Sequence, residues 1–142
     1  MDNGKNICVY IRSTQKSKDN GTDSIEFYTE GKYYIKGASH YITYKESEIS
    51  GMEGTTSTIK VEPDAVTLIR TGSISSKLIF KKSEATVTTY GTQFGCFDMI
   101  ISTEDINVDA NHDGEYRLHL KYALEIHGLG ATANELMLSF KN

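Results

Sequence analysis

Hydrophobic and polar residues alternate over Glu115 to His127, the most regular stretch of the chain. The apolar positions of this stretch are Tyr116, Leu118, Leu120, Tyr122, Leu124 and Ile126. The positions between them are mostly charged or polar. Because successive side chains of a strand point to opposite faces of a sheet, this pattern predicts a long antiparallel strand with one buried face. A helix would scatter the same apolar residues around its whole circumference.

The same alternation recurs more weakly along the rest of the chain. Strands are expected over 6–15, 24–29, 33–36, 39–50, 55–62, 65–71, 75–81, 85–90, 96–108, 115–127 and 135–141. A turn is expected at residues 30–32 (Glu-Gly-Lys), and residues 96–108 can hold one or two strands. No helix longer than two turns is expected. Short loops between consecutive strands predict an antiparallel meander, and closure hides its edge strands. We therefore predict an all-β protein, a single closed meander barrel of about eight to ten strands, in one domain spanning residues 1–142.

Composition and charge exclude several classes of protein. The 142 residues carry a net charge of −4, which argues against a nucleic-acid binder, because a phosphate backbone needs a basic face. No apolar run approaches the ~18 residues of a membrane span, and the polar first residues do not resemble a signal peptide. We therefore expect a cytoplasmic protein with neither nucleic-acid nor membrane partners. Cys8 and Cys96 have no partner at ligand spacing, so we expect reduced, mostly buried thiols.

Two short motifs resemble cofactor or metal sites and fail in context. Gly128 to Ala133 matches the dinucleotide pattern G-x-G-x-x-A, but a strand rather than a helix is expected after it, so a hairpin is the better interpretation. Asp109 to Gly114 begins like a calcium loop, yet Leu120 occupies the position of the bidentate Glu.

His119 and His127 share a face but would lie about 26 Å apart along one strand, so they cannot share a metal ion. We predict no cofactor, no metal site and no catalytic residue.

Charged residues continue the apolar faces of two expected strands. The face of Ile42 and Tyr44 reaches Glu46 and then Glu48, and the face of Val66 and Leu68 reaches Arg70. A buried charge is costly unless it is paired, so Arg70 should meet Glu46 or Glu48. The alternative is that these strand ends extend past the core into water.

Lys60 is a second candidate partner for these carboxylates. It shares a face with Thr56 and Thr58, and that face would have to turn inward. The apolar Ile59 and Val61 favour the opposite orientation.

Several blocks of sequence together resemble a known family. They are YITYKESE at 41–48, GMEGTTSTIK at 51–60, IRTG at 69–72, LIF at 78–80 and YGTQFG at 90–95. The chain resembles the YwiB-like family over nearly its whole length; these are small bacterial proteins with a domain of unknown function and a calycin (lipocalin-like) β-barrel. Gln93 stands where Pro is more common. The resemblance implies the barrel and no agreed activity. Its motif positions imply an interior polar cluster of Tyr44, Glu46, Glu48, Thr58, Lys60, Arg70, Tyr90 and Thr92.

Three functions are compatible with this sequence. The first is binding of a small, partly apolar ligand with a polar or anionic group. Arg70 would anchor this group, with Lys60 as a second candidate anchor, and the walls would include Tyr44 and Tyr90. The second is a non-catalytic interaction module with a filled barrel, whose protein partner the sequence does not identify. The third is an enzyme that uses Glu46 and Glu48 for acid–base chemistry.

Overall fold

The computed structural model describes residues 4–18, 21–92, 94–112, 114–128 and 130–141. It contains ten strands and one short 3₁₀ helix. The strands are β1 (Lys5–Ser17), β2 (Gly21–Lys36), β3 (Ser39–Lys45), β4 (Thr55–Val61), β5 (Val66–Gly72), β6 (Ser76–Phe80), β7 (Ala85–Thr92), β8 (Gly95–His112), β9 (Glu115–Ile126) and β10 (Gly130–Lys141), and the helix η1 is Glu48–Ser50. Among these residues, no helix has the length and apolar character needed to cross a bilayer.

All ten strands belong to one antiparallel sheet in the order β6-β5-β4-β3-β2-β1-β10-β9-β8-β7. Consecutive strands pair as hairpins, and the first strand pairs with the last. The two ends of the sheet, β6 and β7, meet through a bridge between Ser75 and Gly91 and through a hydrogen bond from the Thr86 hydroxyl to the carbonyl of Ile79. The result is a nearly closed meander barrel, which confirms the predicted all-β architecture.

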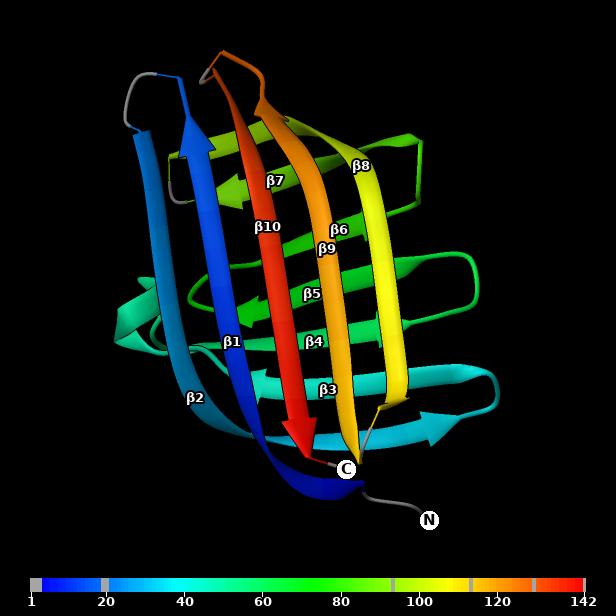
Figure 1. Ribbon diagram of the computed structural model, residues 1–142. Coiled ribbons are helices and arrows are strands. Elements are labelled where there is room, and N and C mark those ends of the chain that lie inside the picture. The colour runs from blue at the N-terminus through cyan, green and yellow to red at the C-terminus, as the bar shows by residue number, and fades with distance from the viewer. Residues whose placement is uncertain (1–3, 19–20, 93, 113, 129, 142) are drawn as a thin grey trace.

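Figure 1 shows a flattened barrel with two layers whose strands run crosswise. The front layer contains β1, β10, β9 and parts of β2 and β8, while β3 to β7 form the back layer. Strand β2 bends from the front layer into the back layer, so it is one continuous strand. The turn predicted at residues 30–32 is therefore wrong.

Gly31 lies at this corner of β2. It pairs with Ile7 of β1 on one side and with Tyr44 of β3 on the other. A Cβ atom at Gly31 would lie 2.5 Å from the carbonyl oxygen of Thr43. Glycine is needed here because the two layers approach each other closely at the corner.

The core lies between the two layers and follows the alternation seen in the sequence. In β9, Tyr116, Leu118 and Leu120 are at most 1% exposed, as the alternation predicted. The ring of Tyr116 stacks on Phe140 of β10, with 4.9 Å between the ring centroids. Aromatic side chains therefore fill the interior of the barrel at this end.

Both cysteines differ from the prediction. Cys8 and Cys96 are free and exposed, whereas mostly buried thiols were expected. In β1 the buried residues are Ile7, Val9 and Ile11, so Cys8 occupies the alternate, outward face. Its position follows from the period of the strand and overrides the general preference of cysteine for the interior.

Candidate functional site

Glu46 enters the barrel because it continues the inward face of β3. Ile42 and Tyr44 are buried, and Glu46 is the next residue on the same face, 8% exposed. Its backbone N–H donates to the carbonyl of Thr55 at 2.9 Å, which extends the pairing with β4 by one residue past the strand end. The carboxylate is therefore held at the edge of the core by backbone hydrogen bonding as well as by its side chain.

Strand pairing places three polar side chains in one row across the back layer. Tyr44 of β3 pairs with Ser57 of β4, and Ser57 pairs with Arg70 of β5. Residues directly opposite each other in neighbouring strands project on the same side of a sheet. Tyr44, Ser57 and Arg70 thus surround Glu46 from three strands.

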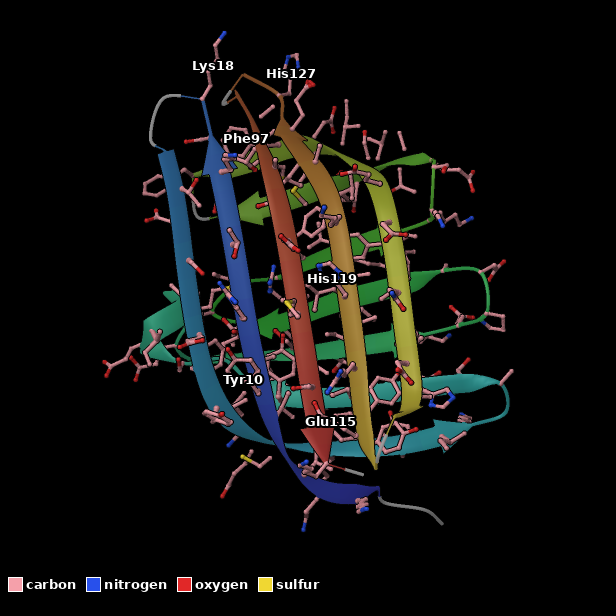
Figure 2. All side chains as sticks on the ribbon, in the orientation of Figure 1. Tyr10, Lys18, Phe97, Glu115, His119 and His127 are labelled. Carbon is pink, nitrogen blue, oxygen red and sulfur yellow. The ribbon has the colours of Figure 1, made fainter. Side chains whose placement is uncertain are left out.

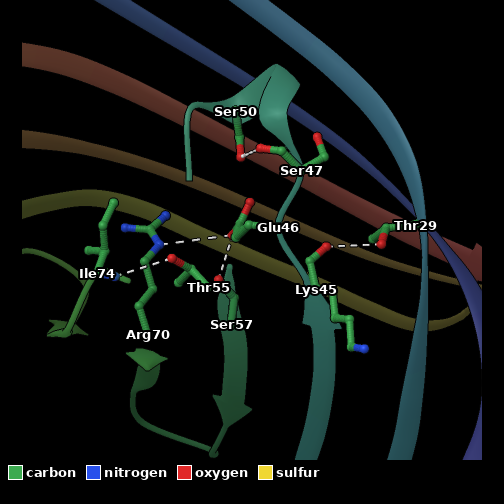
Figure 3. Close-up of polar contacts among 9 residues, drawn as sticks. All are labelled: Thr29, Lys45, Glu46, Ser47, Ser50, Thr55, Ser57, Arg70 and Ile74. Carbon is green, nitrogen blue, oxygen red and sulfur yellow. Dashed lines mark hydrogen bonds and ion pairs between the residues drawn. The ribbon is translucent and has the colours of Figure 1, made fainter. Parts of the chain in front are cut away.

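The carboxylate of Glu46 is the centre of this polar group (Figure 3). The hydroxyl of Ser57 donates to Oε2 of Glu46 at 2.5 Å, and Nε of Arg70 lies 3.9 Å from the same oxygen. The predicted pairing of Arg70 with a carboxylate is confirmed. At this distance the two groups attract each other electrostatically without a hydrogen bond, and Nε of Arg70 is buried without a hydrogen-bond partner in the described part of the chain.

Two tyrosines beside this pair stay protonated. Burial raises the pKa of the Tyr44 hydroxyl, the negative charge of Glu46 raises it further, and Arg70 lowers it. Burial also raises the pKa of Tyr122, with Arg70 again acting in the opposite direction. Both phenols therefore remain neutral at physiological pH and can donate hydrogen bonds.

A cavity of about 480 Å³ opens onto these groups. Strands β1, β2, β9 and β10 of the front layer line it on one side, and the end of β3, the helix η1 and β5 line it on the other. We call it the mouth cavity, and its lining residues are Ile11, Ser13, Gln15, Asp23, Ile25, Phe27, Tyr44, Glu46, Ile49, Ser50, Met52, Arg70, Tyr122, Leu124, Asn134 and Leu136. Polar and apolar side chains both line this cavity. A concave site in which convergent polar groups fix the orientation of a ligand is the usual form of a small-molecule site.

Glu48 does not join Glu46. Strand β3 ends at Lys45, and the side chain of Ser47 accepts a hydrogen bond from the N–H of Ile49, which caps η1. The helical turn ends the alternation of inward and outward side chains, so Glu48 is exposed in η1. The expectation that both carboxylates share an inward face is wrong for Glu48, and the paired-carboxylate site of the enzyme hypothesis is not formed.

Thr58 and Lys60 lie on the outer face of β4. The inward residues of this strand are Thr55, Ser57, Ile59 and Val61. The hydroxyl of Thr58 lies 3.3 Å from that of Thr43.

Lys60 pairs with Glu62 at 3.8 Å and lies over the ring of Tyr41. The interior placement implied by the family resemblance is therefore wrong for Thr58 and Lys60. Ile59 and Val61 occupy the inward face of β4, so Thr58 and Lys60 point outward.

Tyr90 and Thr92 belong to β7, and their side chains lie outside the described residues.

Sequence reasoning missed two members of the polar group. Ser57 precedes Ile59 and Val61 on one face, so the alternation of β4 could have placed it inside. Tyr122 stands among the apolar residues of β9, so the alternation predicts only a core residue at this position. Its hydroxyl becomes significant because Arg70 faces it from the opposite layer, which strand order alone reveals.

The histidines of β9 have separate environments. His119 lies about half-way along the strand and His127 beyond its end (Figure 2). Nε2 of His119 lies 2.5 Å from a carboxylate oxygen of Glu135 on β10. Within the described ranges, no group of three or more His, Cys, Asp or Glu residues could hold a metal ion.

Comparison with known proteins identifies relatives over most of the chain. A family model described as "Domain of unknown function (DUF1934)" matches residues 9–138. The uncharacterized beta-barrel protein YwiB of Bacillus subtilis (strain 168) is 27% identical over 120 residues, which cover 84% of this chain and 82% of the relative. The crystal structure of the B. subtilis ywiB protein superposes with a TM-score of 0.85 and 22% identity, covering 100% of this chain and 94% of the other. This likeness supports the barrel fold.

Proposed function

We propose that this chain, which belongs to the family of domains of unknown function DUF1934, binds a small, partly apolar molecule in the mouth cavity. The family description assigns no activity, so the proposal rests on geometry. The polar group of the ligand would contact Arg70, and its apolar part would lie against side chains such as Phe27 and Leu136. The calycin resemblance supports the proposal by fold analogy only.

The observation that carries this proposal is the pair of Glu46 and Arg70, which lines a cavity whose wall also includes apolar side chains such as Phe27 and Leu136. The side chains are 3% and 20% exposed, respectively. Apolar residues of similar volume often stabilise a fold as well as a buried ion pair does, or better. A charged pair that faces a cavity and leaves an Arg N–H unsatisfied is therefore better explained by recognition than by stability.

A protein-interaction module is the second candidate, and the outer face of the front layer favours it. Tyr10 and Tyr28 are neighbours there, with ring centroids 5.0 Å apart, and Tyr28 is 73% exposed. Met137 on the adjacent β10 is 43% exposed. Aromatic residues and Met are enriched at interfaces, although this patch does not explain why Glu46 is buried.

The proposal places the protein in the cytoplasm. The two free, exposed thiols support a reducing compartment. The net charge of −4 gives no support for nucleic acid as a partner.

Native mass spectrometry of the gently purified protein tests the proposal. We expect an additional non-covalent mass that is lost in Arg70→Ala. Arg117→Ala is the matched control, because Arg117 is an exposed cation paired with Glu115 on the outer face, and it should retain the mass. A bare mass, together with no rise in unfolding temperature across a diverse collection of small molecules, would favour the interaction module instead.

A further inference from the structure

The charges that line the mouth cavity do not suit an anion. Among the described lining residues, three carry a formal charge at neutral pH, namely Arg70, Glu46 and Asp23. One positive and two negative charges give a sum of −1. Asp23 is exposed at the rim, so the inner end of the cavity holds one cation and one anion.

Arg70 cannot be approached without also approaching Glu46. Nε of Arg70 and Oε2 of Glu46 are 3.9 Å apart, and the carboxylate is almost fully buried. Charges interact strongly where water is excluded, and two carboxylates that share such a site repel each other. A ligand carboxylate bound to Arg70 would therefore be held against a fixed negative charge.

The hydrogen-bonding groups at the inner end include both donors and acceptors. Arg70 and the protonated hydroxyl of Tyr122 can donate, and the carboxylate of Glu46 can accept. Arg70 projects from β5 and Tyr122 from β9, so a group between the two layers meets donors on both sides. A head group that fits these partners accepts hydrogen bonds from the two donors and donates one to the carboxylate, without a net charge.

We propose that the polar head of the ligand is uncharged and of the carboxamide type. Its carbonyl oxygen accepts from Arg70 and Tyr122, and its N–H donates to Glu46. This inference rests on the proposed function, because it specifies the ligand class of the same cavity. The apolar tail lies along Ile25 and Leu136, which flank Ser13 of β1 on the inner face of the front layer.

Three probes with the same hydrocarbon chain and different heads test this inference. They are octanamide, octanoate and octylamine, which are neutral, anionic and cationic at neutral pH. Isothermal titration calorimetry on the unmodified protein should show that octanamide binds more than about tenfold tighter than either charged probe, a difference of ~1.4 kcal/mol. This comparison needs no variant.

Glu46→Gln then tests the cause of the preference. The substitution removes the fixed negative charge and keeps the side-chain shape, so octanoate should bind at least about tenfold tighter than to the unmodified protein. Glu62→Gln is the matched control, because Glu62 also pairs with a cation, Lys60, but lines a different cavity. It should leave the preference unchanged. Circular dichroism confirms that each variant is folded.

The outcomes separate this inference from the proposed function. Tighter binding of octanoate or octylamine than of octanamide would overturn the carboxamide assignment and leave the mouth cavity as a ligand site. Equal binding of all three probes would also overturn it. If none binds and native mass spectrometry shows a bare protein, the proposed function itself is wrong.

Discussion

Arg70 lies 3.9 Å from Glu46, on a carboxylate oxygen that also accepts a 2.5 Å hydrogen bond from Ser57. The two partners are unequally buried, with the Glu46 side chain 3% exposed and that of Arg70 20% exposed. Without Arg70 the buried carboxylate would have no compensating charge, whereas without Glu46 the guanidinium would still be partly solvated. Removing the cation should be the more harmful change.

Arg70→Met tests this asymmetry, because Met keeps a long side chain and removes the charge. We expect a loss of about 2 kcal/mol in the free energy of unfolding, less than a fully buried pair would lose, because Arg70 is partly solvated. Urea denaturation measures it. Lys60→Met is the matched control, since both partners of the Lys60–Glu62 pair are about a third exposed, and it should cost under ~0.5 kcal/mol. An equally small loss in Arg70→Met would mean that water already solvates Arg70.

Tyr116 carries a buried hydroxyl without a hydrogen-bond partner in the described residues. Tyr116→Phe removes this unsatisfied group, so we expect the unfolding free energy to stay constant or rise by up to about 1 kcal/mol. Tyr33→Phe is the matched comparison, because the Tyr33 hydroxyl lies 2.6 Å from Nδ1 of His40, and its removal should cost ~1 kcal/mol. Equal destabilisation by both variants would imply that Tyr116 has a bound-water partner.

Alkaline pH should destabilise the fold through its buried tyrosines. Burial raises the pKa of Tyr33, Tyr44, Tyr116 and Tyr122, so the folded state retains protons that the unfolded state releases near pH ~10. Stability is then fully present below the unfolded pKa and is lost as pH rises above it. Urea denaturation between about pH 8 and pH 11 should show this decline. Tyr116→Phe should make it shallower, whereas Tyr28→Phe, at an exposed ring, should not.

Exposure of the cysteines predicts rapid chemical modification. Cys8 and Cys96 are both free and exposed, so a thiol reagent such as Ellman's should titrate both in the native protein at the rate of a solvent-accessible thiol. Cys8→Ser should halve the signal without changing stability. If native labelling requires denaturant, the side chains lie inside and the outward orientation of Cys8 is wrong.

The alternation of apolar residues predicted most of the barrel, and it failed where another interaction overrode the strand period. It placed Tyr116 to Leu120 and Glu46 correctly. It could not place Glu48, because Ser47 caps a helical turn there. Gly31 stands between Glu30 and Lys32, which resembles a turn, and only the proximity of β3 shows that the strand continues.

The candidate site was predicted only in part, because strand alternation does not contain all the information needed to place its residues. Strand alternation gives the face on which a residue lies, and this was enough to pair Arg70 with Glu46. It gives no information on which strands face each other across the barrel. Alternation therefore identifies Tyr122 only as a core residue. The family resemblance implies that Lys60 points inward, although Ile59 and Val61 indicate the opposite face.

Gly31→Ala tests the close approach at the corner of β2. The added Cβ would lie 2.5 Å from the backbone oxygen of Thr43 and 3.1 Å from Cγ2 of Val9, so strands must separate to accommodate it. We expect a loss of about 2–3 kcal/mol, the cost of overpacking against backbone. Gly91→Ala is the matched control within a strand, because nothing lies within 4 Å of its added Cβ, and it should change stability by less than ~0.5 kcal/mol. Similar values for the two variants would show that β2 can bend without a glycine.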